Sequence, residues 1–129
     1  MKPEQKFKQK LKKYFEKQGA EVFMIESPFA PGFPDIVLFV PDSFIELIET
    51  KVIKSEDTKI KFEKTQIAFY RRLNRCTVSP SKLYIYIYIF VTDTKKIYYI
   101  HFKSLINIRN LGNKKFLDYK SYFMEKKII

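Results

Sequence analysis

The pattern of apolar and polar positions divides the chain into a series of short elements. Apolar residues recur at helical spacing near the N-terminus and again past the middle, and alternating or continuous apolar runs between them indicate strands. The predicted elements are, in chain order, a helix at 3–18, strands at 21–26, 36–40 and 44–51, a helix at 62–75, and strands at 83–91 and 96–102. From Ser104 onward the pattern weakens, and we expect a short helix and a frayed basic tail.

The loops between these elements differ in character. The segment at 27–34 holds three prolines and a glycine, which predicts a rigid loop. The charged segment at 54–61 is expected to be a mobile loop. The apolar run at 36–40 predicts a strand buried on both faces, and the short connection to 44–51 makes those two strands antiparallel.

The strand at 44–51 carries two charges on a face that is otherwise apolar. Alternation places Glu49 and Lys51 on the same face as Ile45 and Leu47. A buried carboxylate is costly unless a charge or a metal meets it. Asp35 begins the preceding strand, directly after Pro34, so two carboxylates and an ammonium can meet at one place in the sheet. Such a set suits Mg²⁺-dependent hydrolysis of a phosphodiester.

Each of these residues also has an ordinary structural interpretation. Asp35 after a proline is compatible with a plain turn aspartate, and Glu-x-Lys is a common solvated pair at a strand end. Gln66 falls within the apolar stripe of the second helix, where a buried amide needs a polar partner, either in an active site or at a sheet edge. Glu4 lies in the apolar stripe of the first helix, where it would reach the site or simply favour the helix N-terminus.

The net charge indicates what class of partner the protein binds. The 129 residues include 25 Lys and Arg against 14 Asp and Glu, a net charge of +11, which favours nucleic acid as a partner. An anionic membrane or acidic protein is an alternative, and AT-rich coding would also raise the lysine content. The length predicts one domain.

Single cysteine and histidine residues exclude several classes of site. Cys76 has no second cysteine with which to pair, so we expect a reducing, cytoplasmic location. His101 alone excludes a His-rich zinc site. The N-terminus shows no secretory signal, and the run from Leu83 to Val91 is too short to span a bilayer as a helix.

An ordered set of motifs resembles a known family. It consists of Gly32-Phe33-Pro34-Asp35, Glu49-Thr50-Lys51 on the next strand, and Thr65-Gln66 on the following helix. The set is similar to the VRR-NUC (virus-type replication-repair nuclease) family of the PD-(D/E)xK nuclease superfamily, in which an acid on the first helix is also usual. The resemblance covers roughly residues 4–91, and 92–129 would be additions to a single domain.

The resemblance implies a fold and an activity. The fold would be α/β, with an αβββαβ core in which helices flank a central mixed sheet. Asp35 and Glu49 would bind Mg²⁺ or Mn²⁺ with the Thr50 carbonyl, as one ion or as two if Glu4 takes part. Lys51 would orient the attacking water or steady charge on the phosphate, and Gln66 would position Lys51 or the water.

Family members of this length are small phage and bacterial proteins, often homodimeric, that cleave DNA. The resemblance therefore implies a metal-dependent endonuclease selective for flaps or four-way junctions. Two alternatives remain open at this point. One is a restriction- or recombination-type endonuclease of the same superfamily. The other is a non-catalytic nucleic-acid binder that uses the aromatic residues of strand 83–91 as a stacking platform, unless those aromatics are simply packed in the core.

Overall fold

The structure is a computed structural model that describes residues 1–25, 33–41, 43–76, 83–108, 112 and 114–128. Gly32, most of the proline-rich loop and the expected loop at 77–81 lie outside the described residues. The observed elements are α1 (Pro3–Lys17), β1 (Glu21–Met24), β2 (Ile36–Val40), β3 (Phe44–Ile53), α2 (Lys64–Cys76), β4 (Leu83–Val91), β5 (Lys96–His101), α3 (Phe102–Leu105), α4 (Phe116–Tyr119), a 3₁₀ turn (Lys120–Tyr122) and β6 (Met124–Lys126). The predicted αβββαβ order is confirmed.

The six strands form one mixed sheet in the order β1-β2-β3-β4-β5-β6. Strands β3 and β4 are parallel and lie side by side at the centre, and every other neighbouring pair is antiparallel. The parallel pairing continues to Ile53↔Val91, which extends β3 two residues beyond the predicted end. Because β2 pairs with β3 only as far as Ile36↔Ile48, the last residues of β3 project past the end of β2.

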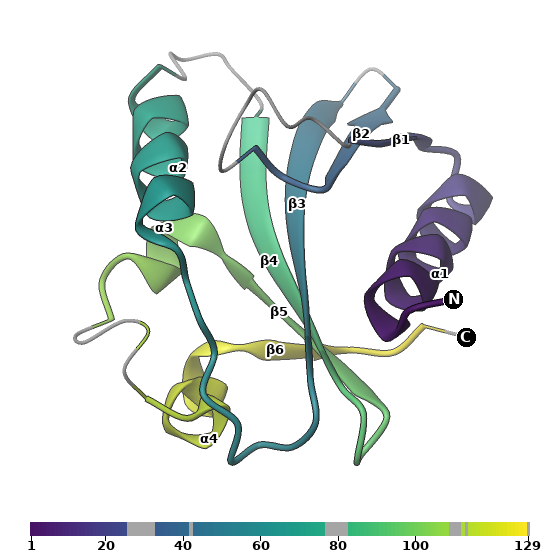
Figure 1. Ribbon diagram of the computed structural model, residues 1–129. Coiled ribbons are helices and arrows are strands. Elements are labelled where there is room, and N and C mark those ends of the chain that lie inside the picture. Colours follow the sequence, from purple (N-terminus) through teal and green to yellow (C-terminus); the bar gives the residue numbers. More distant parts are fainter. Residues whose placement is uncertain (26–32, 42, 77–82, 109–111, 113, 129) are drawn as a thin grey trace.

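Helices cover both faces of the sheet (Figure 1). On one face, α1 packs its buried residues Phe7, Leu11 and Phe15 against β2, β3 and β4. On the other face, α2 contributes the fully buried Tyr70 to a second core, which α3 and α4 complete. The alternation of β3 follows this division, since Leu47 lies in the α2-side core and Ile48 in the α1-side core.

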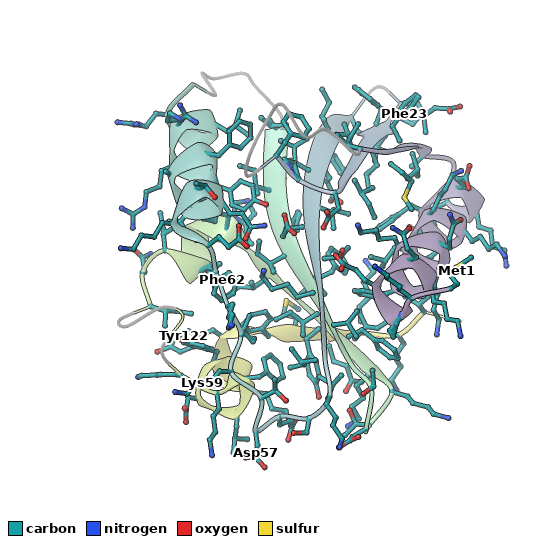
Figure 2. The ribbon with its side chains drawn as sticks, in the orientation of Figure 1. Met1, Phe23, Asp57, Lys59, Phe62 and Tyr122 are labelled. Atoms are coloured by element: carbon teal, nitrogen blue, oxygen red, sulfur yellow. The ribbon has the colours of Figure 1, made fainter. Side chains whose placement is uncertain are left out.

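Two strand and loop expectations are wrong. Strand β2 is not buried on both faces, because Phe39 is 41% exposed and packs edge-on against the exposed Phe23 of β1. The segment after β3 is held in place, since Ile60 is fully buried and the Thr58 carbonyl accepts a backbone hydrogen bond from Phe116. Phe23 and Asp57, from these two regions, lie at opposite ends of the molecule (Figure 2).

The C-terminal segment is also more ordered than a frayed tail. After α4, residues Met124–Lys126 pair with β5 as the last strand of the sheet. Phe116, Tyr119 and Phe123 are buried, so a few large aromatics anchor a segment that lacks any long periodic pattern. No helix in the described part of the chain is long and apolar enough to cross a membrane.

Candidate active site

Asp35 is held at the mouth of β2 by the neighbouring strand. The backbone N–H and the Oγ1 hydroxyl of Thr50 both donate to its Oδ2, each at 2.9 Å. The Asp35 carbonyl accepts a backbone hydrogen bond from the Ile25 N–H, which ties the residue after β1 to the same place. One carboxylate oxygen is thus fixed by two donors, and the orientation of the other follows from it.

The hairpin brings Asp35 and Glu49 close together. Pairing of β2 with β3 ends at Ile36↔Ile48, and Asp35 and Glu49 are the next residues beyond that pair. Their carboxyl groups are hydrogen-bonded to each other. The two predicted carboxylates are therefore neighbours.

Glu49 is only 5% exposed and is supported from the second helix. The Tyr70 hydroxyl donates a hydrogen bond of 2.7 Å to its Oε2. Burial, followed by the charge of Asp35 and a hydrogen bond between the two carboxyl groups, raises the pKa of Glu49 to about 8, against the opposing effects of Tyr70 and Lys51. The raised pKa means that the Glu49 carboxyl group favours its protonated form unless a cation lies beside it.

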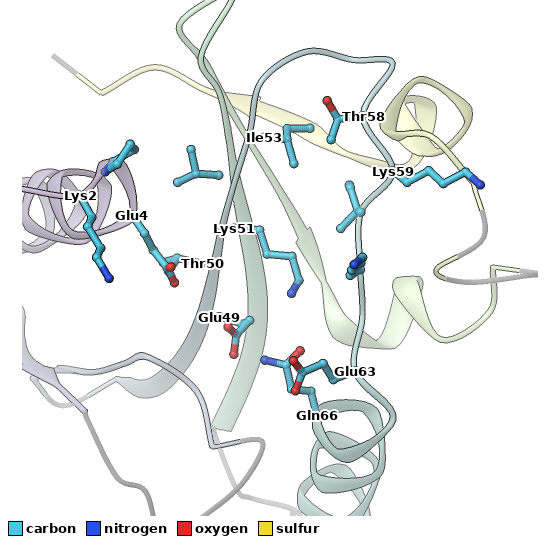
Figure 3. A pocket seen from close by; sticks show the side chains of 14 residues that line it. Lys2, Glu4, Glu49, Thr50, Lys51, Ile53, Thr58, Lys59, Glu63 and Gln66 are labelled. Atoms are coloured by element: carbon cyan, nitrogen blue, oxygen red, sulfur yellow. The ribbon is translucent and has the colours of Figure 1, made fainter.

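Lys51 and Gln66 reach the same cavity as Glu49 from different elements (Figure 3). The cavity has a volume of about 670 Å³ and is bounded by β3, the segment after it and the starts of both long helices. The Lys51 ammonium lies 5.3 Å from the centre of the Phe62 ring. The Gln66 Oε1 atom is buried and has no hydrogen-bond partner among the described residues. It can therefore accept a hydrogen bond from a water molecule or another donor in the cavity.

Glu4 lies at the rim of this cavity and differs from the other two acids. Its side chain is 53% exposed, and it pairs with Lys8 one turn along α1, with Nζ 3.6 Å from Oε1. Lys8 in turn lies 3.4 Å from Asp35 Oδ1. Glu4 is thus linked to Asp35 through a lysine.

Oxygen atoms of the β2–β3 end fit a hard divalent cation. Thr50 points its N–H at Asp35, and the N–H and C=O of one strand residue face the same edge, so the Thr50 carbonyl also faces Asp35. Asp35, Glu49 and this carbonyl supply the oxygen donors that Mg²⁺ and Mn²⁺ prefer. Among the described residues no cluster of three or more Asp, Glu, His or Cys side chains is arranged to hold a metal, so the set consists of two carboxylates and backbone.

Two residues that contact the carboxylates escaped the sequence reasoning. In the sequence, Tyr70 is an ordinary member of the apolar stripe of α2. Its hydroxyl reaches Glu49 only because α2 packs on the face of the sheet to which Glu49 points. Lys8 is one of many lysines in α1. Its signal is its position, because at 100° per residue it falls next to Phe15, at the edge of the apolar stripe that also holds Glu4.

The aromatic face of β4 is largely covered, which disfavours its use as a stacking platform. Tyr88 is buried and packs edge-on against Phe15 of α1, with ring centres 6.0 Å apart. Phe90 stacks on Phe7 at 5.5 Å. Tyr84 remains the one markedly exposed aromatic of the described strand, so a row of stacked bases has no continuous surface there.

Comparison with known proteins identifies solved structures with a similar fold. No family model matches the sequence, and no curated protein matches it. Among solved structures, a VRR_NUC domain aligns with 70% of this chain and 87% of its own length, at 18% identity and a TM-score of 0.49. Hjc, a Holliday junction resolvase from the archaeal hyperthermophile Archaeoglobus fulgidus, aligns with 96% of this chain and 89% of its own length, at 14% identity and a TM-score of 0.55.

The similarity to Hjc extends over nearly the whole chain, including the C-terminal additions. It confirms the expected fold class, an α/β protein with a mixed sheet between helices, as in restriction-endonuclease-like nucleases. The resemblance inferred from the motifs is therefore confirmed at the level of the fold.

Proposed function

We propose that this protein is a metal-dependent endonuclease that hydrolyses phosphodiester bonds in DNA, with a preference for branched structures. The observation that carries the proposal is the pair Asp35 and Glu49, hydrogen-bonded to each other at the end of β2, with Lys51 on the same face of β3 as Glu49. Two acids placed together with one nearly buried are costly to folding unless a cation meets them. The shared fold with a junction resolvase supports the same reading.

Each side chain has a role that follows from its contacts. A bound Mg²⁺ would lower the pKa of a coordinated water and offset negative charge on the phosphate. Asp35 and Glu49 would hold the ion, with Thr50 fixing Oδ2 of Asp35 and Tyr70 orienting Glu49. Lys51 contributes positive charge beside the phosphate as negative charge develops there.

Gln66 and the basic wall of the cavity complete the proposed site. The unpartnered Gln66 Oε1 accepts a hydrogen bond from the attacking water or from Lys51, which orients either donor. Lys2, Lys59 and Lys61 line the same cavity and bind the phosphates that flank the scissile bond. These contacts are to the backbone, so selectivity comes from the shape of the DNA.

A cleavage assay tests the proposal. Labelled duplex, flap, splayed-arm and four-way-junction DNAs are incubated with the protein in Mg²⁺ or in EDTA. We expect Mg²⁺-dependent cleavage that is greatest on a branched DNA and is lost in Asp35→Asn and Glu49→Gln. DNA binding by both variants should persist, because neither acid contacts the backbone directly.

The control is Glu21→Gln, which removes an exposed carboxylate from β1 and should cut like the unaltered protein. Binding to all four DNAs without cleavage under any divalent metal would instead establish the non-catalytic alternative. A fixed cutting sequence in plain duplex would favour the restriction-type alternative.

A further inference from the structure

Lys8 occupies a partly buried position between two carboxylates. Its side chain is 11% exposed, which is low for a lysine on a surface helix. Its ammonium lies 3.4 Å from Asp35 Oδ1 and 3.6 Å from Glu4 Oε1. Lys8 is therefore a fixed cation that joins the end of β2 to the first turn of α1.

The hydrogen-bonding capacity of Asp35 decides what else can bind there. Both Thr50 donors go to Oδ2, which has two lone pairs and is thereby saturated. Oδ1 remains, with one direction used by Lys8. One lone pair of Oδ1 is left, which is enough to bind a single metal ion that Glu49 also binds.

A second metal ion would need the direction that Lys8 uses. In two-metal sites the ions lie about 3.5–4 Å apart and share an oxygen of a bridging carboxylate. One oxygen of Glu49 accepts the Tyr70 hydrogen bond, and the other acids that line the cavity are Glu4 and Glu63. Of these two, Glu4 is the one linked to Asp35 through Lys8. The space between Asp35 and Glu4 is where the Lys8 ammonium lies.

We propose that Lys8 takes the place of a second metal ion, so that this nuclease works with one divalent cation and one resident ammonium. The inference rests on the proposed metal site at Asp35 and Glu49, and it gives Glu4 a different role. Glu4 is the counter-ion that positions Lys8, and it does not coordinate metal. Lys8 is a positioning residue, since it acts through Asp35.

The ammonium lies within salt-bridge distance of a carboxylate oxygen on either side, Asp35 Oδ1 and Glu4 Oε1. A permanent unit charge at this point keeps Oδ1 partly neutralised before any metal binds. It also repels a second divalent ion.

Counting bound ions tests the inference without reference to activity. Isothermal titration with Mn²⁺, checked by electron paramagnetic resonance of free Mn²⁺, should give one ion per chain for the unaltered protein. Lys8→Met keeps the length of the side chain and removes its charge, and should bind two ions. Adding Glu4→Gln to Lys8→Met should return the count to one, because it removes the second ligand.

Further variants guard against a trivial result. Lys8→Arg preserves the charge and should keep one ion, whereas Lys8→Gln removes the charge and should bind two ions if Lys8→Met folds poorly. Lys13→Met removes one exposed positive charge from the same helix and should leave the count at one. Thermal unfolding of each variant establishes that it is folded before titration.

The outcomes separate this inference from the proposed function. Two ions in the unaltered protein, or one ion in Lys8→Met with only a change in affinity, would overturn the role of Lys8 and leave the nuclease proposal intact. One ion in the unaltered protein and two in Lys8→Met, with no DNA cut, would uphold Lys8 while the nuclease proposal fails. No Mn²⁺ binding by any variant would remove both.

Discussion

At the scale of single residues, β3 carries one buried acid, Glu49, and one half-buried acid, Glu46. Glu46 and Glu49 are three positions apart on β3 and therefore point to opposite faces of the sheet. Burial raises the pKa of Glu46 to about 7, opposed by the charge of Lys126, and raises that of Glu49 to about 8. Glu49 has a proposed purpose in metal binding. The buried Glu46 Oε2 has no hydrogen-bond partner among the described residues.

These shifts predict how stability depends on pH. Both acids hold their protons more tightly when folded than at the ordinary carboxyl pKa of 4.5, so their stabilising effect is complete below that pH. Stability of the metal-free protein should then fall as pH rises from about 4.5 to about 8, by an amount on the order of a few kcal/mol. Urea unfolding in EDTA across this range measures it.

Matched variants assign the slope to each acid. Glu49→Gln should weaken the pH dependence of the free energy of unfolding at the higher end of the range. Glu46→Gln should weaken it nearer to neutral pH. Mn²⁺ should restore stability at pH 8 in the Glu46 variant and not in the Glu49 variant, because the metal favours the deprotonated form. Parallel pH curves for all three proteins would contradict the assigned burial effects.

Lys51 and Gln66, which line the cavity beside Glu49, should affect the cleavage rate more than metal binding. Lys51→Met should lower kcat by about 100- to 1,000-fold through lost charge stabilisation, with Mn²⁺ affinity retained because an ammonium is not a ligand. Gln66→Ala should cost less, about 10-fold, as a supporting contact. Single-turnover cleavage and Mn²⁺ titration measure the two effects.

Lys54→Met provides the control, since Lys54 is an exposed lysine just past the end of β3. Loss of Mn²⁺ binding in Lys51→Met would show that the lysine supports the carboxylates themselves. A Gln66→Ala protein that unfolds yet shows no loss of rate when kept cold would give Gln66 a structural role alone.

At the scale of elements, the C-terminal additions support the segment that borders the proposed site. Backbone hydrogen bonds from Phe116 and Leu117 reach the carbonyls of Thr58 and Glu56, and Lys120 pairs with Glu56. Thr58 lines the site cavity. The additions therefore fix one wall of a cavity whose other walls come from the core.

The last strand gives an element-scale prediction. Strand β6 covers the edge of β5, and its Lys126 ammonium lies within 5.5 Å of the ring centres of Tyr14, Phe15 and Tyr99. A chain ending at Phe123 should lose about 1–3 kcal/mol of stability and aggregate more readily, because β5 becomes an exposed edge. Chemical unfolding and light scattering measure both.

Mn²⁺ binding by this shortened chain should persist, since β6 lies at the far edge of the sheet from β2. A chain ending at Lys126 keeps the strand and should lose less stability. Equal losses for the two chains would place the stabilising contacts in the last residues instead of in β6.

At the scale of the whole molecule, basic side chains gather around two cavities. Lys2, Lys51, Lys59 and Lys61 line the cavity of the proposed site. A second cavity of about 290 Å³, between α1 and the β5–β6 edge, is lined by Lys10, Lys95, Lys96, Lys126 and Lys127. Together with the net charge of +11, this predicts DNA binding dominated by phosphate contacts.

We predict that the affinity for DNA falls log-linearly with salt and that a homodimer prefers a four-way junction to duplex. Two copies related by a two-fold axis would place two sites on two equivalent strands of a junction. Substituting Lys59 and Lys61 together by alanine should reduce the salt slope by about one to two units. Fluorescence anisotropy with Asp35→Asn, in a salt series, measures affinity without cleavage.

The control replaces Lys95 and Lys127, which line the other cavity, and reports whether that surface also contacts DNA. Light scattering at working concentration measures the oligomeric state. A monomer with equal affinity for junction and duplex would leave a general nuclease without structure preference.

The sequence by itself determined the elements and their faces. Periodicity reports which side of a helix or strand is apolar, and it correctly placed Glu49 with Leu47 and opposite Ile48. The short hairpin connection makes β2 and β3 antiparallel neighbours, so the sequence alone predicts that Asp35 lies near Glu49. These features are local, because each depends on residues close together in the chain.

Only the tertiary structure decided the contacts between distant segments. Tyr70 is 21 residues from Glu49, and no local pattern indicates where its hydroxyl points. The salt bridge of Lys8 to Asp35 depends on how α1 crosses the sheet, and the pairing of β6 with β5 depends on three buried aromatics around α4. Such contacts are set by the packing of whole elements, which a single sequence encodes without any repeating signal.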